Sequence, residues 1–165
     1  MDLPSWYRDS VSQFPPLHIV LHRPEIPQNT GNIGRTCVAL NAKLWLIRPL
    51  GFSLDARHLR RAGLDYWPHL NWEVVDEWAK LPPRLPDGRF WFFTKKATTA
   101  YSDVVYQPGD VLVFGGEAEG LPRTLLDPYP NQLLRIPIGP RVRSLNLANA
   151  VAVAAYEAMR QWGVR

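Results

Sequence analysis

The sequence predicts an α/β domain whose mostly parallel sheet is flanked by helices. Its apolar runs are short and continuous, which is typical of strands covered on both faces. Segments of helical composition alternate with these runs, which favours parallel strands joined by crossover connections. The 16 prolines fall between the apolar runs and indicate stiff loops. We therefore divide the chain into an N-terminal extension, residues 1–16, and a single domain, residues 17–165.

Composition narrows the class of protein further. A chain of 165 residues with 46% hydrophobic and 21% charged residues suits one globular domain. No apolar run approaches the roughly 18 residues that cross a bilayer, and the N-terminus lacks the apolar core of a signal peptide, so we expect no membrane association. The single cysteine, Cys37, excludes an internal disulfide and agrees with a cytoplasmic location. A net charge of +4 is compatible with nucleic acid without requiring it.

Five apolar runs predict the strands, each stopped by proline, glycine or a polar turn. They are residues 17–21, 43–47, 89–94, 111–114 and 133–136. The run at 89–94 is aromatic along most of its length, as expected of an inner strand covered on both faces.

Four segments predict helices between or after the strands. They are residues 36–41, 55–62, 73–80 and 145–159. The first follows a polar turn, 28–35, in which Asn29 or Thr30 is a plausible cap. The last is rich in Ala, Leu and Val without Gly or Pro, and Ser144 is its expected N-cap.

Polar loops follow three of the predicted strands. They span Asn29–Arg35, Gly115–Pro122 and Pro137–Asn146. Because ligands bind at the carboxyl ends of parallel strands, we expect these loops to form a site. Gly115 and Gly116 let a ligand approach the backbone closely. Arg141, Arg143 and Ser144 before a helix can hold an anionic or polar ligand; the alternative is an ordinary connection with solvated arginines.

Several standard sites are excluded or unsupported. The glycines form neither the dinucleotide-binding fingerprint nor a Walker A loop. His18 and His22 lie on or beside a strand, where their spacing does not converge on one ion, while His58 and His69 have no partners at ligand spacing. Cys37 suits a core position better than a nucleophile. We therefore expect no metal.

Taken together, the three loops resemble the three motifs of the SPOUT superfamily of RNA 2′-O-ribose methyltransferases, in the same order and spacing. The segments are NTGNIGR (29–35), FGGEAEGLP (114–122) and the stretch 136–151. The resemblance runs from about Leu17 to Trp162 and is closest to the short TrmL-type enzymes, which methylate the wobble nucleotide, position 34, of tRNA. It implies a C-terminal trefoil knot, an obligate homodimer, S-adenosylmethionine as cofactor and a tRNA substrate.

The resemblance implies roles in or beside the reaction for five residues. They are Asn29, Arg35, Glu117, Ser144 and Asn146. Because an arginine pKa above about 12 leaves almost no neutral guanidine at pH 7, Arg35 suits stabilising the alkoxide, or gripping the adjacent phosphate, better than acting as general base. Glu117 is expected to buttress the loops or to bind Arg35. Each residue also has an alternative without a role in the reaction. Arg35 would be a surface arginine and Glu117 a solvated loop acid. Asn29 would be a turn residue and Asn146 a residue of a first helical turn.

The resemblance also implies that loop backbone holds a bent S-adenosylmethionine in the knot. The cofactor-binding residues are expected to be Phe93, Thr94, Gly115, Gly116, Ile136, Ser144 and Leu145. Ala148, Ala152 and Ala155, at helical spacing, suit close helix packing in a dimer, and an intrachain core explains them equally well.

Clustered arginines are the candidates for contact with RNA phosphates. They are Arg57, Arg60, Arg61, Arg141 and Arg143, and for each a solvated charge is the alternative. Gly116 and Glu119 depart from the TrmL-type pattern, and residues 1–16 have no counterpart in the short enzymes. The alternatives are methylation of another tRNA position or of rRNA, and a non-catalytic RNA-binding protein with this fold.

Overall fold

A computed structural model of the chain describes residues 16–54 and 65–164. The strands are β1 (His18–His22), β2 (Lys43–Ile47), β3 (Trp72–Val75), β4 (Phe90–Phe93), β5 (Val111–Gly115) and β6 (Leu133–Leu134). The helices are α2 (Pro27–Ala39), α4 (Arg123–Leu126) and α5 (Leu147–Gln161). Short 3-10 turns occupy Trp67–His69, Trp78–Lys80, Pro82–Arg84 and Pro130–Gln132. None of these helices is long and apolar enough to cross a bilayer.

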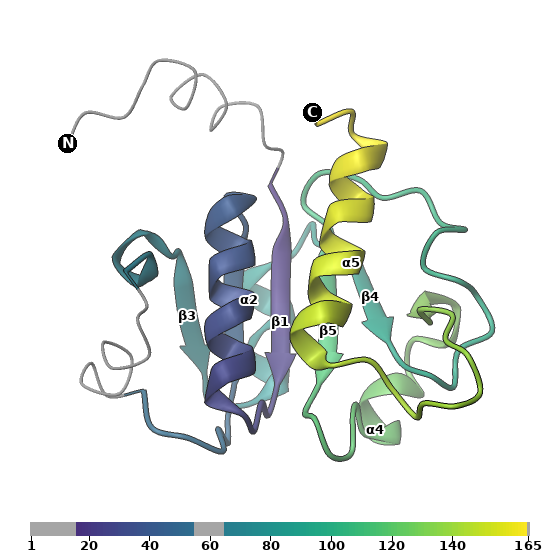
Figure 1. Ribbon diagram of the computed structural model, residues 1–165, viewed down its shortest axis with the longest axis horizontal. Helices are drawn as coiled ribbons and strands as arrows, with labels where there is room; N and C mark the ends of the chain where they lie inside the picture. The colour runs from purple at the N-terminus through teal and green to yellow at the C-terminus, as the bar shows by residue number, and fades with distance from the viewer. Residues whose placement is uncertain (1–15, 55–64, 165) are drawn as a thin grey trace.

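The six strands form one sheet in the order β3-β2-β1-β5-β4-β6, and every neighbouring pair is parallel. This confirms the predicted mostly parallel sheet. All strands point the same way, so their carboxyl ends lie along one edge (Figure 1). The sequence order reverses between β1 and β5, which are neighbours in the sheet. In open α/β sheets such a reversal opens a crevice at the carboxyl ends.

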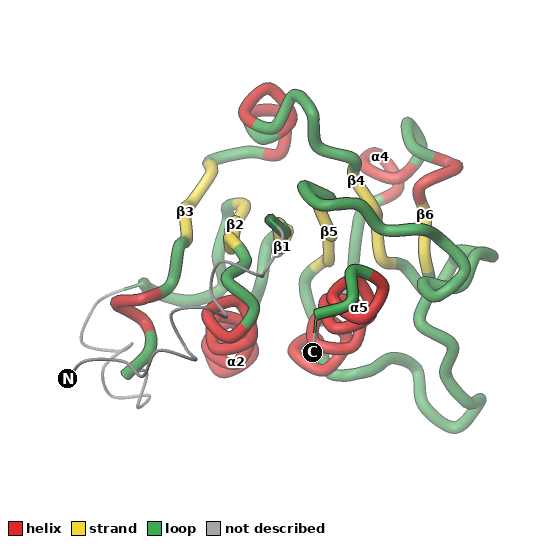
Figure 2. Tube along the Cα trace, turned by 90° about the horizontal axis from the view of Figure 1, so that it is seen from above, coloured by secondary structure: helices red, strands yellow, loops and turns green. Residues whose placement is uncertain are grey.

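Helices α2 and α5 cover one face of the sheet side by side (Figures 1 and 2). Ile19 and Leu21 of β1 belong to the apolar cluster beneath them. Val20, which points the other way, joins a second cluster with Leu81, Leu125 and their neighbours. Burial on both faces is the reason the strands are continuously apolar rather than alternating.

The helix predicted at 73–80 is wrong. Its first part is strand β3, in which Val74 and Val75 pair with Leu46 and Ile47 of β2. Valine has a higher preference for strands than for helices, and a free edge of the sheet was available to pair with it. Only a 3-10 turn follows, at Trp78–Lys80.

The first polar loop is also not a loop. Helix α2 begins at Pro27, so all of 28–35 is helical and neither Asn29 nor Thr30 caps it. Proline suits the first turn of a helix because its missing N–H has no partner there anyway. The cap comes from another segment: the Glu117 carboxylate accepts from the backbone N–H of Glu25 and Ile26, at 2.7 and 3.2 Å.

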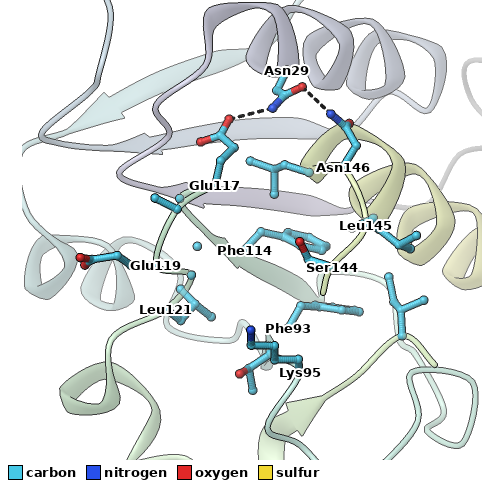
Figure 3. Close-up of a pocket in the computed structure, with 18 of the residues that line it drawn as sticks. Asn29, Phe93, Lys95, Phe114, Glu117, Glu119, Leu121, Ser144, Leu145 and Asn146 are labelled. Atoms are coloured by element: carbon cyan, nitrogen blue, oxygen red, sulfur yellow. Dashed lines mark hydrogen bonds between the residues drawn. The ribbon is translucent and has the colours of Figure 1, made fainter. Parts of the chain in front are cut away.

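Helix α5 starts two residues later than predicted. It spans Leu147–Gln161, and Asn146 rather than Ser144 is its N-cap, with its side-chain oxygen accepting from Ala148 N at 2.9 Å (Figure 3). The predicted helix 55–62 and residues 1–15 of the expected extension lie outside the described residues.

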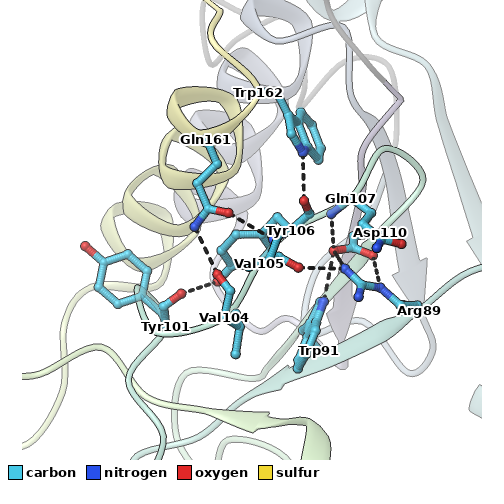
Figure 4. A network of polar contacts seen from close by, with 10 residues as sticks. All are labelled: Arg89, Trp91, Tyr101, Val104, Val105, Tyr106, Gln107, Asp110, Gln161 and Trp162. Carbon is cyan, nitrogen blue, oxygen red and sulfur yellow. Dashed lines mark hydrogen bonds and ion pairs between the residues drawn. The ribbon is translucent and has the colours of Figure 1, made fainter.

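A buried aspartate ties the start of β5 to β4 and to the loop before β5 (Figure 4). Asp110, 1% exposed, accepts from Arg89 Nε at 2.9 Å, from Trp91 Nε1 at 3.0 Å and from Gln107 N at 2.9 Å. The carboxylate beside Arg89 raises the pKa of that guanidinium. The same loop is fastened to the end of α5, where Gln161 accepts from Tyr106 N at 2.9 Å.

We expect Asp110→Asn to lower the free energy of unfolding by about 2–3 kcal/mol, because its amide would turn a donor toward groups that are themselves donors. Chemical denaturation measures the change. Asp87→Asn is the matched control: Asp87 is exposed, so a loss below about 0.5 kcal/mol is expected. Equal stability of the two variants would contradict the role given to Asp110.

Candidate functional site

A cavity of about 410 Å³ lies at the carboxyl ends of β4 and β5, between the loop after β6 and the start of α5 (Figure 3). All seven predicted cofactor residues line it: Phe93, Thr94, Gly115, Gly116, Ile136, Ser144 and Leu145. Of the five residues predicted at the reaction, Asn29, Glu117, Ser144 and Asn146 line it as well. The cavity size is within the range of small-molecule sites.

The cavity has an aromatic floor and a backbone wall. Phe93 and Phe114 stack with ring centroids 4.5 Å apart and planes inclined by 15°. Beside them, the turn after β5 folds back so closely that a Cβ on Gly115 would lie 2.0 Å from the carbonyl carbon of Gly120. Glycine is therefore required at this position, and it leaves backbone N–H and C=O groups within reach of a ligand.

A chain of three polar side chains joins the three motifs above this floor (Figure 3). Asn146 Nδ2 donates to Asn29 Oδ1 at 2.9 Å, and Asn29 Nδ2 donates to Glu117 Oε1 at 3.0 Å. Asn29 is buried, so its amide depends on these two bonds. The predicted buttressing role of Glu117 matches this geometry.

We expect Glu117→Gln to loosen the start of α2, because three donors face the carboxylate and a glutamine amide can accept from them with only one oxygen. The expected loss is about 1–2 kcal/mol in the free energy of unfolding, measured by chemical denaturation. Glu119→Gln is the control two residues away: Glu119 is exposed and should cost less than about 0.5 kcal/mol. If the Glu117→Gln variant has the same free energy of unfolding as the parent protein, the capping role is contradicted.

Arg35 is not part of this cavity. It lies exposed on α2, with its guanidinium 4.8 Å from the centre of the Tyr66 ring. The Tyr66 hydroxyl donates to the carbonyl of Gly31, one turn earlier on α2. Burial raises the pKa of Tyr66, and Arg35 opposes that shift. Within one copy of the described chain the Glu117 carboxylate bonds to Glu25, Ile26 and Asn29 and not to Arg35, so a bond between Glu117 and Arg35 stays a prediction for two copies.

The predicted RNA-binding residues divide into two groups. Arg141 and Arg143 are exposed on the loop that closes the cavity, so they are free to meet a phosphate. Arg57, Arg60 and Arg61 lie outside the described residues.

Sequence reasoning missed part of the cavity lining. The missed residues include Lys95, Lys96, Leu121 and Ile138. Lys95 and Lys96 follow β4 almost directly, so the rule that ligands bind at carboxyl strand ends was a signal that could have found them.

The described residues contain no group of three or more His, Cys, Asp or Glu side chains that could hold a metal ion. His18 instead accepts a hydrogen bond from Trp45 Nε1, at 3.1 Å. Burial raises the pKa of the Cys37 thiol to about 12, which confirms the predicted core position.

His22, at the end of β1, gives the fold a pH dependence. Burial, aided by the neighbouring Arg23, lowers its pKa from 6.5 to about 4. Between these values the unfolded chain binds more protons than the folded one, so the free energy of unfolding should fall as the pH drops from 6.5 toward 4. The expected loss is up to about 3 kcal/mol, measured by denaturation at several pH values. His22→Gln should flatten this part of the profile; an unchanged slope would contradict the assignment.

Comparison with known proteins identifies the family of the chain. Residues 16–156 match the model of the SpoU rRNA Methylase family. The chain belongs to the SpoU methylase family. This membership confirms the predicted resemblance to the SPOUT RNA 2′-O-ribose methyltransferases.

Relatives of this SpoU family member are similar over nearly their whole length. The tRNA (cytidine(34)-2′-O)-methyltransferase of Escherichia coli K12 is 48% identical over 154 residues, which are 89% of this chain and 94% of that protein. A solved structure that bears on 2-OH methylation of C/U34 on tRNA superposes with a TM-score of 0.85 at 48% identity, covering 92% of this chain and 99% of that one. The AdoMet-bound rRNA methyltransferase of Sinorhizobium meliloti has a TM-score of 0.76 at 25% identity, covering 88% and 56%.

Proposed function

We propose that this protein transfers a methyl group from S-adenosylmethionine to a ribose 2′-hydroxyl of tRNA, at the wobble nucleotide 34. The observation that carries the proposal is the cavity at the ends of β4 and β5, because every residue that the motifs assign to the cofactor lines it. The choice of nucleotide is supported by the E. coli relative that is named for cytidine 34 and is 48% identical.

The residues of the cavity suit this cofactor. Phe93 and Phe114 offer an apolar floor, and the glycine-rich turn offers backbone groups to an adenine edge. Glu119, exposed at the cavity, places a carboxylate where it can meet the positive charge of the ligand. When bound, S-adenosylmethionine supplies a methyl group on a positively charged sulfur.

The residues of the chain have to position the acceptor 2′-oxygen and assist the loss of the hydroxyl proton. The cofactor would supply the methyl group and its sulfur would keep the electron pair of the carbon–sulfur bond, while the hydroxyl proton would pass to the adjacent phosphate or to water. Arg35 remains charged at pH 7, so it stabilises the negative oxygen or holds the adjacent phosphate while the proton departs. Ser144 and Asn146 border the cavity, where they orient the ribose and the cofactor.

Two copies of the chain are needed to bring Arg35 to a cavity. Arg35 does not line the cavity of its own chain, and the loop and helix beside that cavity expose apolar side chains. These are Ile26, Ile138, Val142, Leu145, Val153 and Tyr156. A homodimer that covers them would place the Arg35 of one copy against the cavity of the other. Ala148 and Ala155 are already buried within one chain, so the intrachain explanation holds for them.

We extend the proposal to a trefoil knot formed by the segment from β6 to α5 and to a cytoplasmic location. The knot is supported by membership of the SpoU family and by the return of Asn146 to Asn29 after 117 residues. The location is supported by the tRNA substrate that the relatives' names give.

Two measurements test the function. Calorimetry with S-adenosylmethionine should show binding to the purified protein, and absence of binding would refute the methyltransferase and leave an RNA-binding protein. Mapping 2′-O-methyl groups on tRNA incubated with protein and cofactor should place the new methyl at nucleotide 34. A methyl at another tRNA position, or on rRNA alone, would refute the wobble assignment while keeping the enzyme class.

A further inference from the structure

A second cavity, of about 520 Å³, lies beside the first at the carboxyl edge of the sheet. Its walls come from the ends of four neighbouring strands, β2, β1, β5 and β4, and from the segments that follow them. These segments hold one another in place: Arg23 N donates to Ile47 O at 3.0 Å, and Gly51 N donates to Pro24 O at 2.9 Å. The cavity therefore sits where the strand order reverses, at the usual place for a ligand in such sheets.

His22 lines this cavity and is 6% exposed. Among the described residues its imidazole has no hydrogen-bond partner, whereas His18 on the same strand is bonded to Trp45. Thr30 Oγ1 is the one described side-chain N or O atom that is both fully buried and unpaired, so the His22 ring nitrogens are not sealed in the core, and a molecule in this cavity can bond to them. In its neutral form the ring presents one N–H donor and one nitrogen acceptor, which suits the edge of a nucleobase.

Three cations stand around the cavity: Arg23, Lys96 and Arg123. Within residues 16–54 and 65–164 Arg123 pairs only with the exposed Asp127, at 3.7 Å, so a phosphate can displace this partner at little cost. Two acids also line the cavity: Glu25, whose carboxylate accepts from Ala118 N at 3.1 Å, and Glu119, which is exposed on the wall shared with the first cavity. The three cations outnumber the two carboxylates, and His22 offers a neutral polar ring, so the lining suits a nucleotide whose base meets His22 and whose phosphate meets the cations.

The two cavities share one wall. The turn from Gly116 to Leu121, closed by a bridge between Gly116 and Gly120, lines both of them, and so does Lys96. A Cβ on Gly116 would lie 2.6 Å from the carbonyl oxygen of Arg23, so the wall packs directly against the end of β1. A base in the second cavity would hold its ribose over this wall, next to the cofactor cavity.

We propose that the second cavity receives the base of the RNA nucleotide that is methylated, with His22 bonding to the base edge and Arg23 and Arg123 holding the adjoining phosphate. The inference rests on the proposed function and adds the site for the acceptor nucleotide. It requires the target base to be unstacked from its neighbours and inserted into the cavity.

The first test compares His22→Leu with His69→Leu. Leucine keeps an apolar body and removes both ring nitrogens; His69 is exposed and lines neither cavity, so its variant is the matched control. With an anticodon stem-loop RNA as substrate, His22→Leu should lower kcat/KM about tenfold or more and leave the Kd of S-adenosylmethionine within about twofold. Unchanged kcat/KM in both variants overturns the inference.

The second test uses the unmodified protein, so it does not depend on a folded variant. The same RNA carries 4-thiouridine at the target nucleotide and is irradiated with the protein and S-adenosylhomocysteine. Crosslinked peptides should contain residues that line only the second cavity, 22–25, 49–51 or 122–123. Crosslinks found only outside these segments overturn the inference. The proposed function fails if the protein methylates no RNA. The inference alone fails if the protein methylates RNA and the crosslinks lie elsewhere.

Discussion

Replacing Arg35 by alanine should abolish most methyl transfer, with kcat falling by about 10²–10³, while the Kd of S-adenosylmethionine stays within about twofold. The reason is the position of the guanidinium, which lies on α2 outside the cofactor cavity and packs over Tyr66. Its removal therefore deletes a charge that acts in the reaction and leaves the lining of the cavity unchanged. Single-turnover methylation of tRNA measures the first quantity and calorimetry the second.

The control for this prediction is Arg160→Ala. Arg160 is also an exposed helical arginine, paired with Glu157 one turn away at 2.8 Å, and it lines neither cavity. Its variant should keep full turnover. Unimpaired methylation by the Arg35 variant would remove Arg35 from the mechanism, and a loss of cofactor binding would assign it to the cavity instead.

Gly115→Ala should damage the cofactor cavity more than any substitution on its rim. The added methyl group would lie 2.0 Å from Gly120 C and 2.3 Å from Leu121 N, which are backbone atoms, so the whole turn must move. We expect about 1–3 kcal/mol less stability and at least about tenfold weaker cofactor binding, measured by denaturation and calorimetry.

Gly139→Ala is the matched control, because a Cβ there meets nothing within 4 Å and the residue is not in the left-handed region. This variant should match the parent protein in stability and in cofactor affinity. If the two alanine variants behave alike, the close approach of the turn to Gly115 does not determine the cavity.

The strands were largely predictable from sequence, because a short continuous apolar run bounded by turn residues, such as 111–114, is typical of a buried strand. The helix starts were not. Asn29 was expected in a loop because polar residues and glycine follow β1, yet Glu117, 88 residues away from Asn29, caps that helix. Rules that predict a helix start from neighbouring residues do not detect a cap that a distant segment provides.

The seven residues that the resemblance assigns to the cofactor line one cavity, because they lie at or after strand ends that the parallel sheet brings together. The remaining lining, which includes Lys95 and Lys96, was missed. The second cavity was not predicted either. His22 looked like part of a strand, and its buried, unpartnered imidazole depends on where Pro49 and Leu121 lie in three dimensions. Neither residue is near it in sequence, so no spacing rule could reveal the cavity.

The bonds among Asn29, Glu117 and Asn146 have a consequence for folding. They join residues 88 and 117 positions apart, so no early fragment of the chain can make them. Contacts of such long range form slowly, because the loops between them must first be closed. The sheet strands β1 and β2 can pair long before the cofactor cavity exists, and binding of the cofactor should therefore be among the last properties that a newly made chain acquires.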